Sequence, residues 1–330
     1  PVYSAAENRY ECGMQYRRAG RSGVMLPAIS LGLWHNFGDV DTLSLSRKKL
    51  HYAFDHGITH FDLANNYGPS YGSAEETFGQ IMKSSFAPYR DELFISTKAG
   101  HDMWPGPYGN WGSRKHLMAS LDQSLKRMNL DYVDVFYSHR YDPETPLEET
   151  LQALVDIVRK GKALYVGLSK YPLDAYLFAS RYLKERDVPC LLYQGRYSML
   201  VREPESQGIL NAVKENGSGF VAFSPLAQGL LTNRYLNGIP DNSRIARGGF
   251  LKKEALTPEV LSKIQALNER AAMRGQSLAE MALAWLLKNE TVISVIVGAS
   301  SVEQLGDSLK TLNHLSFEEE ELHAIEKILM

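Results

Sequence analysis

The sequence predicts one (β/α)₈ barrel domain over residues 1–330, with a hairpin before the barrel and a long loop after its seventh strand. Three observations lead to this prediction. Eight short runs of buried type recur along the chain, amphipathic stretches lie between them, and no linker or low-complexity segment interrupts the alternation. Alternating strands and helices favour a parallel sheet covered by helices. Eight such units fit a closed barrel better than an open, doubly wound sheet.

The strand-like runs are short and rich in β-branched and aromatic residues, as strands are. A hairpin with a glycine-rich turn precedes them and is formed by Met14–Arg18 and Val24–Pro27. The eight expected barrel strands are Ile29–Leu33, His60–Leu63, Leu93–Lys98, Val133–His139, Ala163–Ser169, Cys190–Gln194, Gly219–Ser224 and Ser294–Val297.

Three stretches between these strands have the periodicity of amphipathic helices. In Arg114–Met128 the apolar residues recur at spacings of 3 and 4, which places them on one helix face. Leu147–Arg159 repeats the pattern and is opened by a proline just inside its start. Leu45–His56 is the third.

The stretch Leu226–Lys253 is instead rich in Gly, Asn and Arg and predicts a long loop, and loops of that length are usually functional or disordered.

Composition excludes several classes of protein. Apolar residues make up 44% and charged residues 22% of the 330 residues, which is an ordinary globular mixture. Lys and Arg total 36 against 38 for Asp and Glu, so the chain lacks the basic excess of nucleic-acid and membrane-surface binders. Cys12 and Cys190 form no disulfide framework. No bilayer-spanning run or secretory signal is present, so we expect a cytoplasmic protein.

Two familiar kinds of site are also missing from the sequence. His51, His56 and His60 sit around one predicted helix without the H-E-x-x-H spacing, and a metal site is not expected. No G-x-G-x-x-G follows a candidate strand, and no G-x-x-x-x-G-K-[ST] occurs, which argues against a Rossmann or P-loop nucleotide site.

In a (β/α)₈ barrel the active site lies at the carboxyl ends of the strands. The second strand carries Asp62 and is followed by Tyr67, the third ends at Lys98, and the fourth ends at His139. Taken alone, each residue admits a structural role: a rim charge for Lys98, a turn cap for Asp62, and packing for Tyr67 or His139. Four such residues on consecutive strand ends instead favour a shared chemistry.

Carbonyl reduction needs this set of groups. Hydride transfer creates a developing alkoxide, which requires a proton, and tyrosine is a poor acid because its reference pKa is about 10. The ammonium of Lys98 would lower that pKa, and Asp62 would hold Lys98 charged and in place. His139 could donate a hydrogen bond to the carbonyl and orient it.

The motifs at these strand ends resemble those of a known family. They are Phe61-Asp62 with Tyr67-Gly68, Ser96-Thr97-Lys98, Ser138-His139 and Ser224-Pro225-Leu226. As a set they resemble the aldo-keto reductase superfamily, from about Tyr16 to the C-terminus. The segments 114–117 and 130–135 resemble the branch that includes potassium channel β subunits. Within that branch, 104–109 and 227–231 resemble bacterial L-glyceraldehyde 3-phosphate reductases.

The resemblance implies that Tyr67 is the general acid, that Lys98 and Asp62 tune it, and that His139 orients the carbonyl. It implies reduction of small aldehydes, of the L-glyceraldehyde 3-phosphate or methylglyoxal type, by an extended NADPH. It also implies a homo-oligomer, a tetramer or an octamer. A channel-like regulatory subunit that binds NADPH with little turnover is the alternative, although the channel subunits carry Asn at the position of His139. A Schiff-base aldolase using Lys98 is disfavoured, because Asp62 would keep Lys98 protonated.

The same resemblance implies a set of cofactor contacts. Ser169 and Gln194 would hold the nicotinamide amide, and Phe223 would stack on its ring. Trp34, Trp104 and Trp111 are expected at the substrate mouth, although a core position suits Trp34 nearly as well. Lys170 departs from the family pattern, in which many members carry Asn. Trp34 and Asp62 are also expected to contact the cofactor. At the pyrophosphate the expected contacts are Ser224, Leu226 and Gly229. Toward the adenosine and its phosphate they are Arg234, Arg244, Gly298, Ser300, Gln304 and Asp307.

Overall fold

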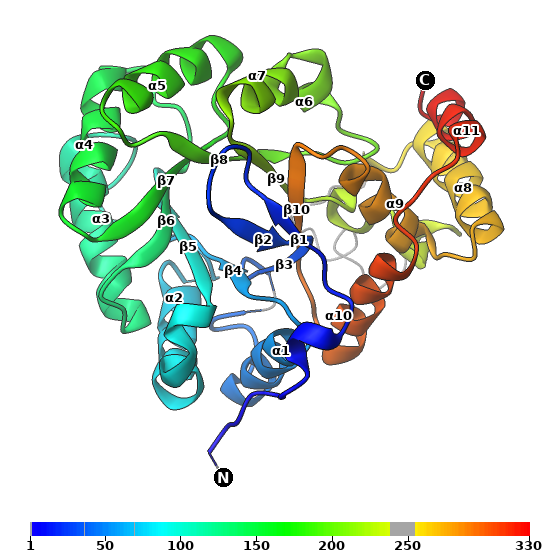
Figure 1. Cartoon of the computed structure of the whole chain (residues 1–330), viewed down its shortest axis with the longest axis horizontal. Helices are drawn as coiled ribbons and strands as arrows, with labels where there is room; N and C mark the ends of the chain where they lie inside the picture. The colour runs from blue at the N-terminus through cyan, green and yellow to red at the C-terminus, as the bar shows by residue number, and fades with distance from the viewer. Residues whose placement is uncertain (1, 36, 69, 238–254) are drawn as a thin grey trace.

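Eight parallel strands close into a barrel that is surrounded by helices, as Figure 1 shows in a view along the barrel. The structure is a computed structural model and describes residues 2–35, 37–68, 70–237 and 255–330. Neighbouring strands follow the order β10-β3-β4-β5-β6-β7-β8-β9, and β9 pairs with β10 to complete the ring. The predicted fold class, including the hairpin, is confirmed, whereas most of the predicted loop Leu226–Lys253 lies outside the described residues.

The observed strands agree with the predicted runs to within two residues at each end. The largest differences are β8, which continues two residues further, and β10, which begins two residues earlier. Both extensions pair with β9. The barrel strands are β3 (Ile29–Gly32), β4 (His60–Asp62), β5 (Phe94–Ala99), β6 (Val133–Ser138), β7 (Ala163–Ser169), β8 (Cys190–Arg196), β9 (Gly219–Phe223) and β10 (Val292–Val297).

The N-terminal hairpin covers the amino end of the barrel. Its strands β1 (Tyr16–Arg18) and β2 (Met25–Pro27) pair antiparallel. The guanidinium of Arg17 donates to the backbone oxygens of Leu287, Asn289 and Val292, just before and at the start of β10. The opposite, carboxyl end of the barrel is therefore the end available for a site.

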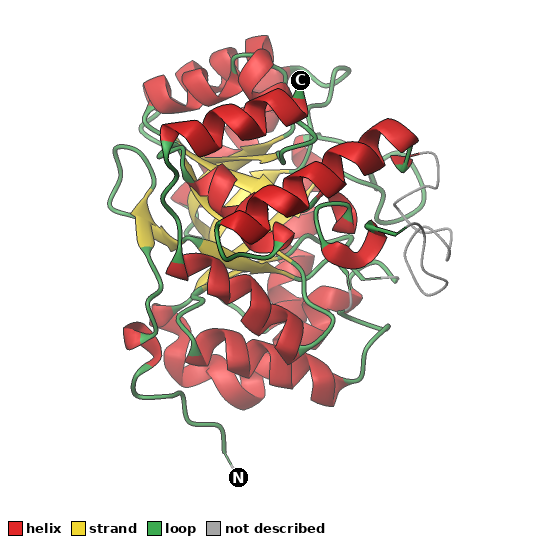
Figure 2. Ribbon diagram, turned by 90° about the vertical axis from the view of Figure 1, so that its right-hand side faces the viewer, coloured by secondary structure: helices red, strands yellow, loops and turns green. Residues whose placement is uncertain are grey.

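The helices form the outer layer, and Figure 2 shows them in red around the yellow strands. The predicted bounds of α3 and α4 are confirmed, whereas α1 begins two residues earlier than predicted because the Thr42 hydroxyl caps it. Pro146 precedes α4 at the cap position and does not lie inside the helix. The α-helices are α1 (Leu43–Asp55), α2 (Ser73–Ile81), α3 (Arg114–Met128), α4 (Leu147–Arg159), α5 (Leu173–Glu185), α6 (Glu203–Ser206), α7 (Ile209–Asn216), α8 (Pro258–Met273), α9 (Leu278–Leu287), α10 (Val302–Leu309) and α11 (Glu319–Leu329).

Two apolar cores stabilise this arrangement. The larger one lies mainly between the strands and the helices and includes Leu50, Leu121 and Leu154 from the inner helix faces. The smaller one fills the barrel interior and joins the hairpin residue Leu26 to Tyr137 and other inward side chains. A filled interior means that the barrel is a scaffold and not a pore.

The connection between β9 and α8 covers 224–257, and 238–254 of it lie outside the described residues. Its described part contains two 3₁₀ turns, Ala227–Gly229 and Asn233–Tyr235, which lie at the carboxyl end of β9. Within the described ranges, no helix is both long and apolar enough to cross a bilayer. Those ranges also contain no group of three His, Cys, Asp or Glu side chains placed to hold a metal ion.

Candidate active site

The four residues predicted to act together meet at the carboxyl end of the barrel. Asp62 ends β4, Lys98 lies near the end of β5, and His139 directly follows β6. Tyr67 comes from the loop after β4. The ammonium of Lys98 lies 2.7 Å from Asp62 Oδ2 and 3.1 Å from the Tyr67 hydroxyl. The rings of Tyr67 and His139 meet edge to face with centroids 6.1 Å apart.

The hydrogen bonds of Lys98 determine where the Tyr67 hydrogen can point. An ammonium has three donors and no acceptor. Its three partners are Asp62 Oδ2, the Leu63 carbonyl at 2.7 Å, and the Tyr67 oxygen. The Tyr67 oxygen therefore accepts from Lys98, and its own hydrogen must point elsewhere. Since Tyr67 lines the adjacent cavity, that hydrogen is available to a bound molecule.

Burial and neighbouring charges have opposite effects on the pKa values of Lys98 and Tyr67. Burial lowers the pKa of Lys98, but the charge of Asp62 and the hydrogen bonds outweigh it and raise the pKa above its ordinary value. For Tyr67, burial raises the pKa and outweighs the lowering effect of Lys98. Lys98 lowers the pKa of Tyr67, as expected, but the expected net lowering of that pKa is not found in the free protein. Tyr67 is therefore a neutral phenol in the free protein.

His139 is neutral as well. Burial, together with the positive charges of Lys98 and Lys170, holds its pKa well below the ordinary value. A neutral imidazole can donate a hydrogen bond but is not a proton-donating acid. Its Nδ1 atom is buried without a hydrogen-bond partner among the described residues. Of these two side chains Tyr67 carries the proton of a neutral phenol, and His139 is suited to hydrogen bonding.

A line of buried hydrogen bonds continues from Asp62 into the barrel. The Ser96 hydroxyl donates to Asp62 Oδ1 at 2.7 Å, and His60 Nε2 lies 3.1 Å from the same hydroxyl. On the other side of the imidazole, His60 Nδ1 lies 2.8 Å from the Ser30 hydroxyl. That hydroxyl lies 2.6 Å from the hydroxyl of Ser294. His60 was grouped by sequence with a helix face, but it is the first residue of β4 and is fully buried in the barrel.

The directions of these hydrogen bonds follow from the acceptor at one end. A carboxylate only accepts, so Ser96 uses its hydrogen on Asp62 and must accept from His60 Nε2–H. Burial lowers the pKa of His60 to about 4, so the ring is neutral and its Nδ1 accepts from Ser30. Each donor in the line thus points toward Asp62, which fixes the carboxylate opposite Lys98.

Replacing Ser96 by alanine is expected to lower the free energy of unfolding by about 1.5–3 kcal/mol, since it removes a buried hydrogen bond to a charged group. The ¹⁵N signals of His60 should also move, because Nε2–H loses its acceptor. Ser85→Ala is the matched control, since Ser85 forms a similar 2.8 Å contact with His51 outside the site. An unchanged His60 spectrum in Ser96→Ala would contradict the hydrogen-bond directions given above.

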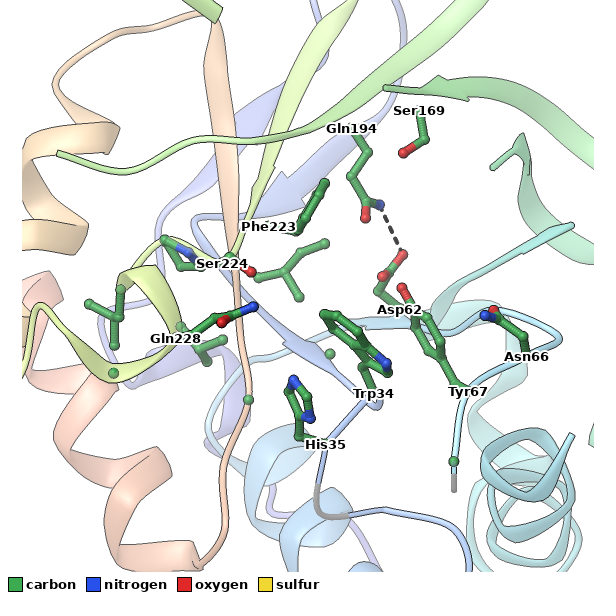
Figure 3. A pocket seen from close by; sticks show the side chains of 18 of the residues that line it. Trp34, His35, Asp62, Asn66, Tyr67, Ser169, Gln194, Phe223, Ser224 and Gln228 are labelled. Atoms are coloured by element: carbon green, nitrogen blue, oxygen red, sulfur yellow. Dashed lines mark hydrogen bonds between the residues drawn. The ribbon is translucent and has the colours of Figure 1, made fainter. Parts of the chain in front are cut away.

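A cavity of about 700 Å³ opens beside Tyr67 at the carboxyl end of the barrel. Its volume lies within the range of ligand pockets. Figure 3 shows Trp34 lying between His35 and Tyr67, and the amide of Gln194 hydrogen-bonded to Asp62. The predicted site residues that line the cavity are Trp34, Asp62, Tyr67, His139, Ser169, Gln194, Phe223, Ser224, Leu226, Gly229, Arg234, Gly298 and Gln304.

The cavity residues fit a nicotinamide cofactor. The Ser169 hydroxyl is buried and has no partner among the described residues, and it lies beside Gln194 at the end of the cavity near Asp62. A carboxamide would give the Ser169 hydroxyl a hydrogen-bond partner. At the other end, a Cβ added to Gly298 would meet no atom within 4 Å, which leaves room for close approach to the backbone. Arg234 supplies a positive charge on the loop after β9.

Other predicted residues lie elsewhere. Lys98 is fully buried behind Tyr67 and does not line the cavity. Ser300 donates to the Gln304 side chain, and Asp307 pairs with Lys310 on the surface. Arg244 lies outside the described residues. Two of the three tryptophans expected at the mouth are also absent from the described cavity lining: Trp104 packs on His116 and Trp111 lies under Arg140.

Several described lining residues were not predicted as site residues, among them His35, Asn66, His101 and Gln228. The rule that identified Asp62 and Lys98 would also have found His35 and His101, because both follow barrel strands by a few residues. Lys170, Ser224 and Gln228 have positive φ angles of 58°, 50° and 57°. Left-handed conformations of non-glycine residues concentrate at functional sites, but the sequence does not reveal them.

Comparison with known proteins agrees with this fold and geometry. The model of the aldo/keto reductase family matches residues 28–330. The chain belongs to the aldo/keto reductase family and is an oxidoreductase. It is 55% identical to the L-glyceraldehyde 3-phosphate reductase of Escherichia coli strain K12, over 99% of this chain and 95% of that protein. It is 36% identical to a probable voltage-gated potassium channel subunit beta of Arabidopsis thaliana, over 91% of this chain and 92% of that protein.

Proposed function

We propose that this protein reduces small aldehydes to alcohols with NADPH, and that L-glyceraldehyde 3-phosphate is its preferred substrate. The main support is the Asp62–Lys98–Tyr67 arrangement, which presents a neutral phenol with a free hydrogen to the cavity. The printed name of the Escherichia coli relatives favours the substrate. Methylglyoxal and similar short aldehydes are the second candidates.

In this mechanism Ser169, Gln194 and Phe223 would hold the nicotinamide end of the cofactor. Ser224, Leu226, Gly229 and the segment around Gly298 would hold its phosphates. When bound, the cofactor would supply the hydride. The aldehyde oxygen accepts hydrogen bonds from Tyr67 and His139, and Tyr67 gives its proton to that oxygen as the alcohol forms. Lys98 stabilises the phenolate that remains on Tyr67, because its ammonium already donates to that oxygen.

The first test follows the loss of NADPH absorbance with L-glyceraldehyde 3-phosphate, methylglyoxal and a larger aromatic aldehyde. We expect turnover with the two short aldehydes, the phosphorylated one having the higher kcat/KM. We expect NADPH to be preferred over NADH, because Arg234 and Gln304 line the end of the cavity expected to hold the adenosine phosphate. Tight NADPH binding without turnover of any aldehyde would contradict the proposal.

That contrary outcome would favour the second candidate, a regulatory subunit that binds the cofactor. The similarity to potassium channel β subunits supports this alternative, while a complete Tyr67–Lys98–Asp62–His139 set argues for catalysis. An aldolase that uses Lys98 as a Schiff base is disfavoured, since the raised pKa keeps Lys98 protonated and all its donors are engaged. The resemblance also leads us to propose a cytoplasmic homo-oligomer, a tetramer or an octamer.

A further inference from the structure

A lysine and a histidine meet at the wall of the cavity next to His139. Lys170 directly follows Ser169, and its left-handed φ of 58° turns the chain at the end of β7. Its ammonium lies 3.2 Å from His101 Nε2, and both residues line the cavity. The rings of His101 and His139 meet edge to face with centroids 4.4 Å apart. The ring of His101 thus lies between the Lys170 ammonium and the His139 ring.

Lys170 is exposed at the cavity wall, whereas several buried or partly buried cations of this protein are paired with carboxylates. Lys98, Lys49 and Arg127 each form an ion pair with a carboxylate. Within the described ranges, Lys170 has no carboxylate within 4.0 Å, and its hydrogen-bond partner is a neutral imidazole. A cation that faces a ligand cavity without a protein counter-charge is suited to an anionic ligand.

Arg140 is a second cation near this wall, and its guanidinium is already engaged. Its guanidinium donates to the Gly100 carbonyl at 2.9 Å and to Asn110 Oδ1 at 2.7 Å. It also lies over the Trp111 ring, 3.5 Å from the centroid. Arg140 is absent from the described cavity lining. Of these two cations, the geometry therefore favours Lys170 for contact with a bound anion.

We propose that Lys170, supported by His101, binds the phosphate of a three-carbon phosphorylated aldehyde while Tyr67 and His139 hold its carbonyl. This inference rests on the proposed reductase function and assigns its substrate class. The cofactor phosphates do not compete for Lys170, because the residues suited to them lie on the loop after β9 and around Gly298. The aldehyde thus gains its own anion subsite on the β7 side of the cavity.

The charges around Lys170 give the subsite a pH dependence. Loss of hydration, together with the positive charges of Lys98, Arg140 and Arg196, lowers the pKa of Lys170 to about 8. His101 has its pKa lowered to about 4 and His139 is also neutral, so neither adds a charge. The free subsite therefore loses its charge as the pH rises through 8. Binding of a phosphate dianion should weaken above that pH, whereas binding of an uncharged aldehyde should not.

The test compares L-glyceraldehyde 3-phosphate with L-glyceraldehyde, which has the same carbon chain without the phosphate. For Lys170→Met we expect KM for the phosphorylated substrate to rise about 10- to 100-fold, with KM for L-glyceraldehyde almost unchanged. Lys170→Arg should restore most of the loss. Arg196→Met is the matched control: it removes a nearby positive charge that does not line the cavity, and it should have little effect.

Two further readouts separate this inference from the proposed function. In the wild type the KM ratio of the two substrates should rise above about pH 8, and in Lys170→Met it should stay flat. Equal losses on both substrates in Lys170→Met would overturn the phosphate subsite while leaving the reductase intact. If no aldehyde is reduced, calorimetric titration of the NADP⁺-bound protein with glycerol 3-phosphate still tests the subsite. Binding lost in Lys170→Met would support it, and absence of binding to the wild type would overturn it.

Discussion

Replacing Tyr67 by phenylalanine is expected to reduce aldehyde turnover by about 10²- to 10⁴-fold, the usual contribution of a positioned general acid. The change removes only the hydroxyl. The ring keeps its stacking on Trp34, with centroids 5.9 Å apart, and its edge-to-face contact with His139. The loss should therefore appear in kcat. Single-turnover rates of NADPH oxidation measure it, and fluorescence titration should show that NADPH still binds.

Tyr137→Phe is the matched control for this variant. Tyr137 is fully buried on β6, and the Lys98 ammonium lies 5.6 Å from its ring centroid. It is not among the described lining residues of the cavity. The same chemical change at this position should therefore leave turnover within a few-fold of the wild type. Equal activity of Tyr67→Phe and Tyr137→Phe would show that Tyr67 is not the proton donor, and His139 or a water would then have to supply the proton.

Replacing Asp62 by asparagine is expected to lower the free energy of unfolding by about 3–5 kcal/mol at pH 7, because it leaves a buried charge without its partner. The Asp62 and Lys98 side chains are 3% and 0% exposed, so solvent screens their interaction very little. The Ser96 hydroxyl and the Gln194 amide both donate to the Asp62 carboxylate as well. Asparagine keeps the shape but removes the charge opposite Lys98. Urea unfolding followed by circular dichroism measures the loss.

The destabilisation by Asp62→Asn should shrink as the pH rises. In the wild type the pKa of Lys98 is raised, so the stability contributed by the pair is present below the unfolded value of about 10.4 and is lost above the raised folded value. Without Asp62, burial lowers the pKa of Lys98 in the folded state. The unfolded chain then binds more protons between that lowered pKa and about 10.4, so the stability of the variant rises with pH there.

Asp156→Asn provides the control for this pair. Asp156 accepts from Arg114 at 2.6 Å, but the two side chains are 24% and 42% exposed. A surface ion pair contributes only about 0–1 kcal/mol, so the same substitution should cost little and show no comparable pH dependence. A loss of equal size in both variants, or a pH-independent loss in Asp62→Asn, would contradict the view that an unpaired buried ammonium causes the destabilisation.

The sequence by itself determined the barrel and the four central residues. Eight short strand runs with amphipathic stretches between them fit few folds, and the carboxyl ends of parallel strands meet at one edge of a barrel. Asp62, Lys98 and His139 are therefore brought together by their position at strand ends, whatever the side chains around them. The bounds of α3 and α4 followed from apolar periodicity, which depends only on local spacing.

Only the tertiary structure decided the contacts that depend on register and on loop conformation. His60 is connected to Asp62 through Ser96 because β4 and β5 pair with Asp62 opposite Ser96. The sequence of either strand alone does not predict this register. Lys170 meets His101 across 69 residues of chain because of a left-handed turn after β7. Arg140 is equally basic in the sequence, but its guanidinium is hydrogen-bonded to Gly100 and Asn110 in the connection after β5. Which charge remains available to a ligand depends on such partners, and partners are a property of the folded chain.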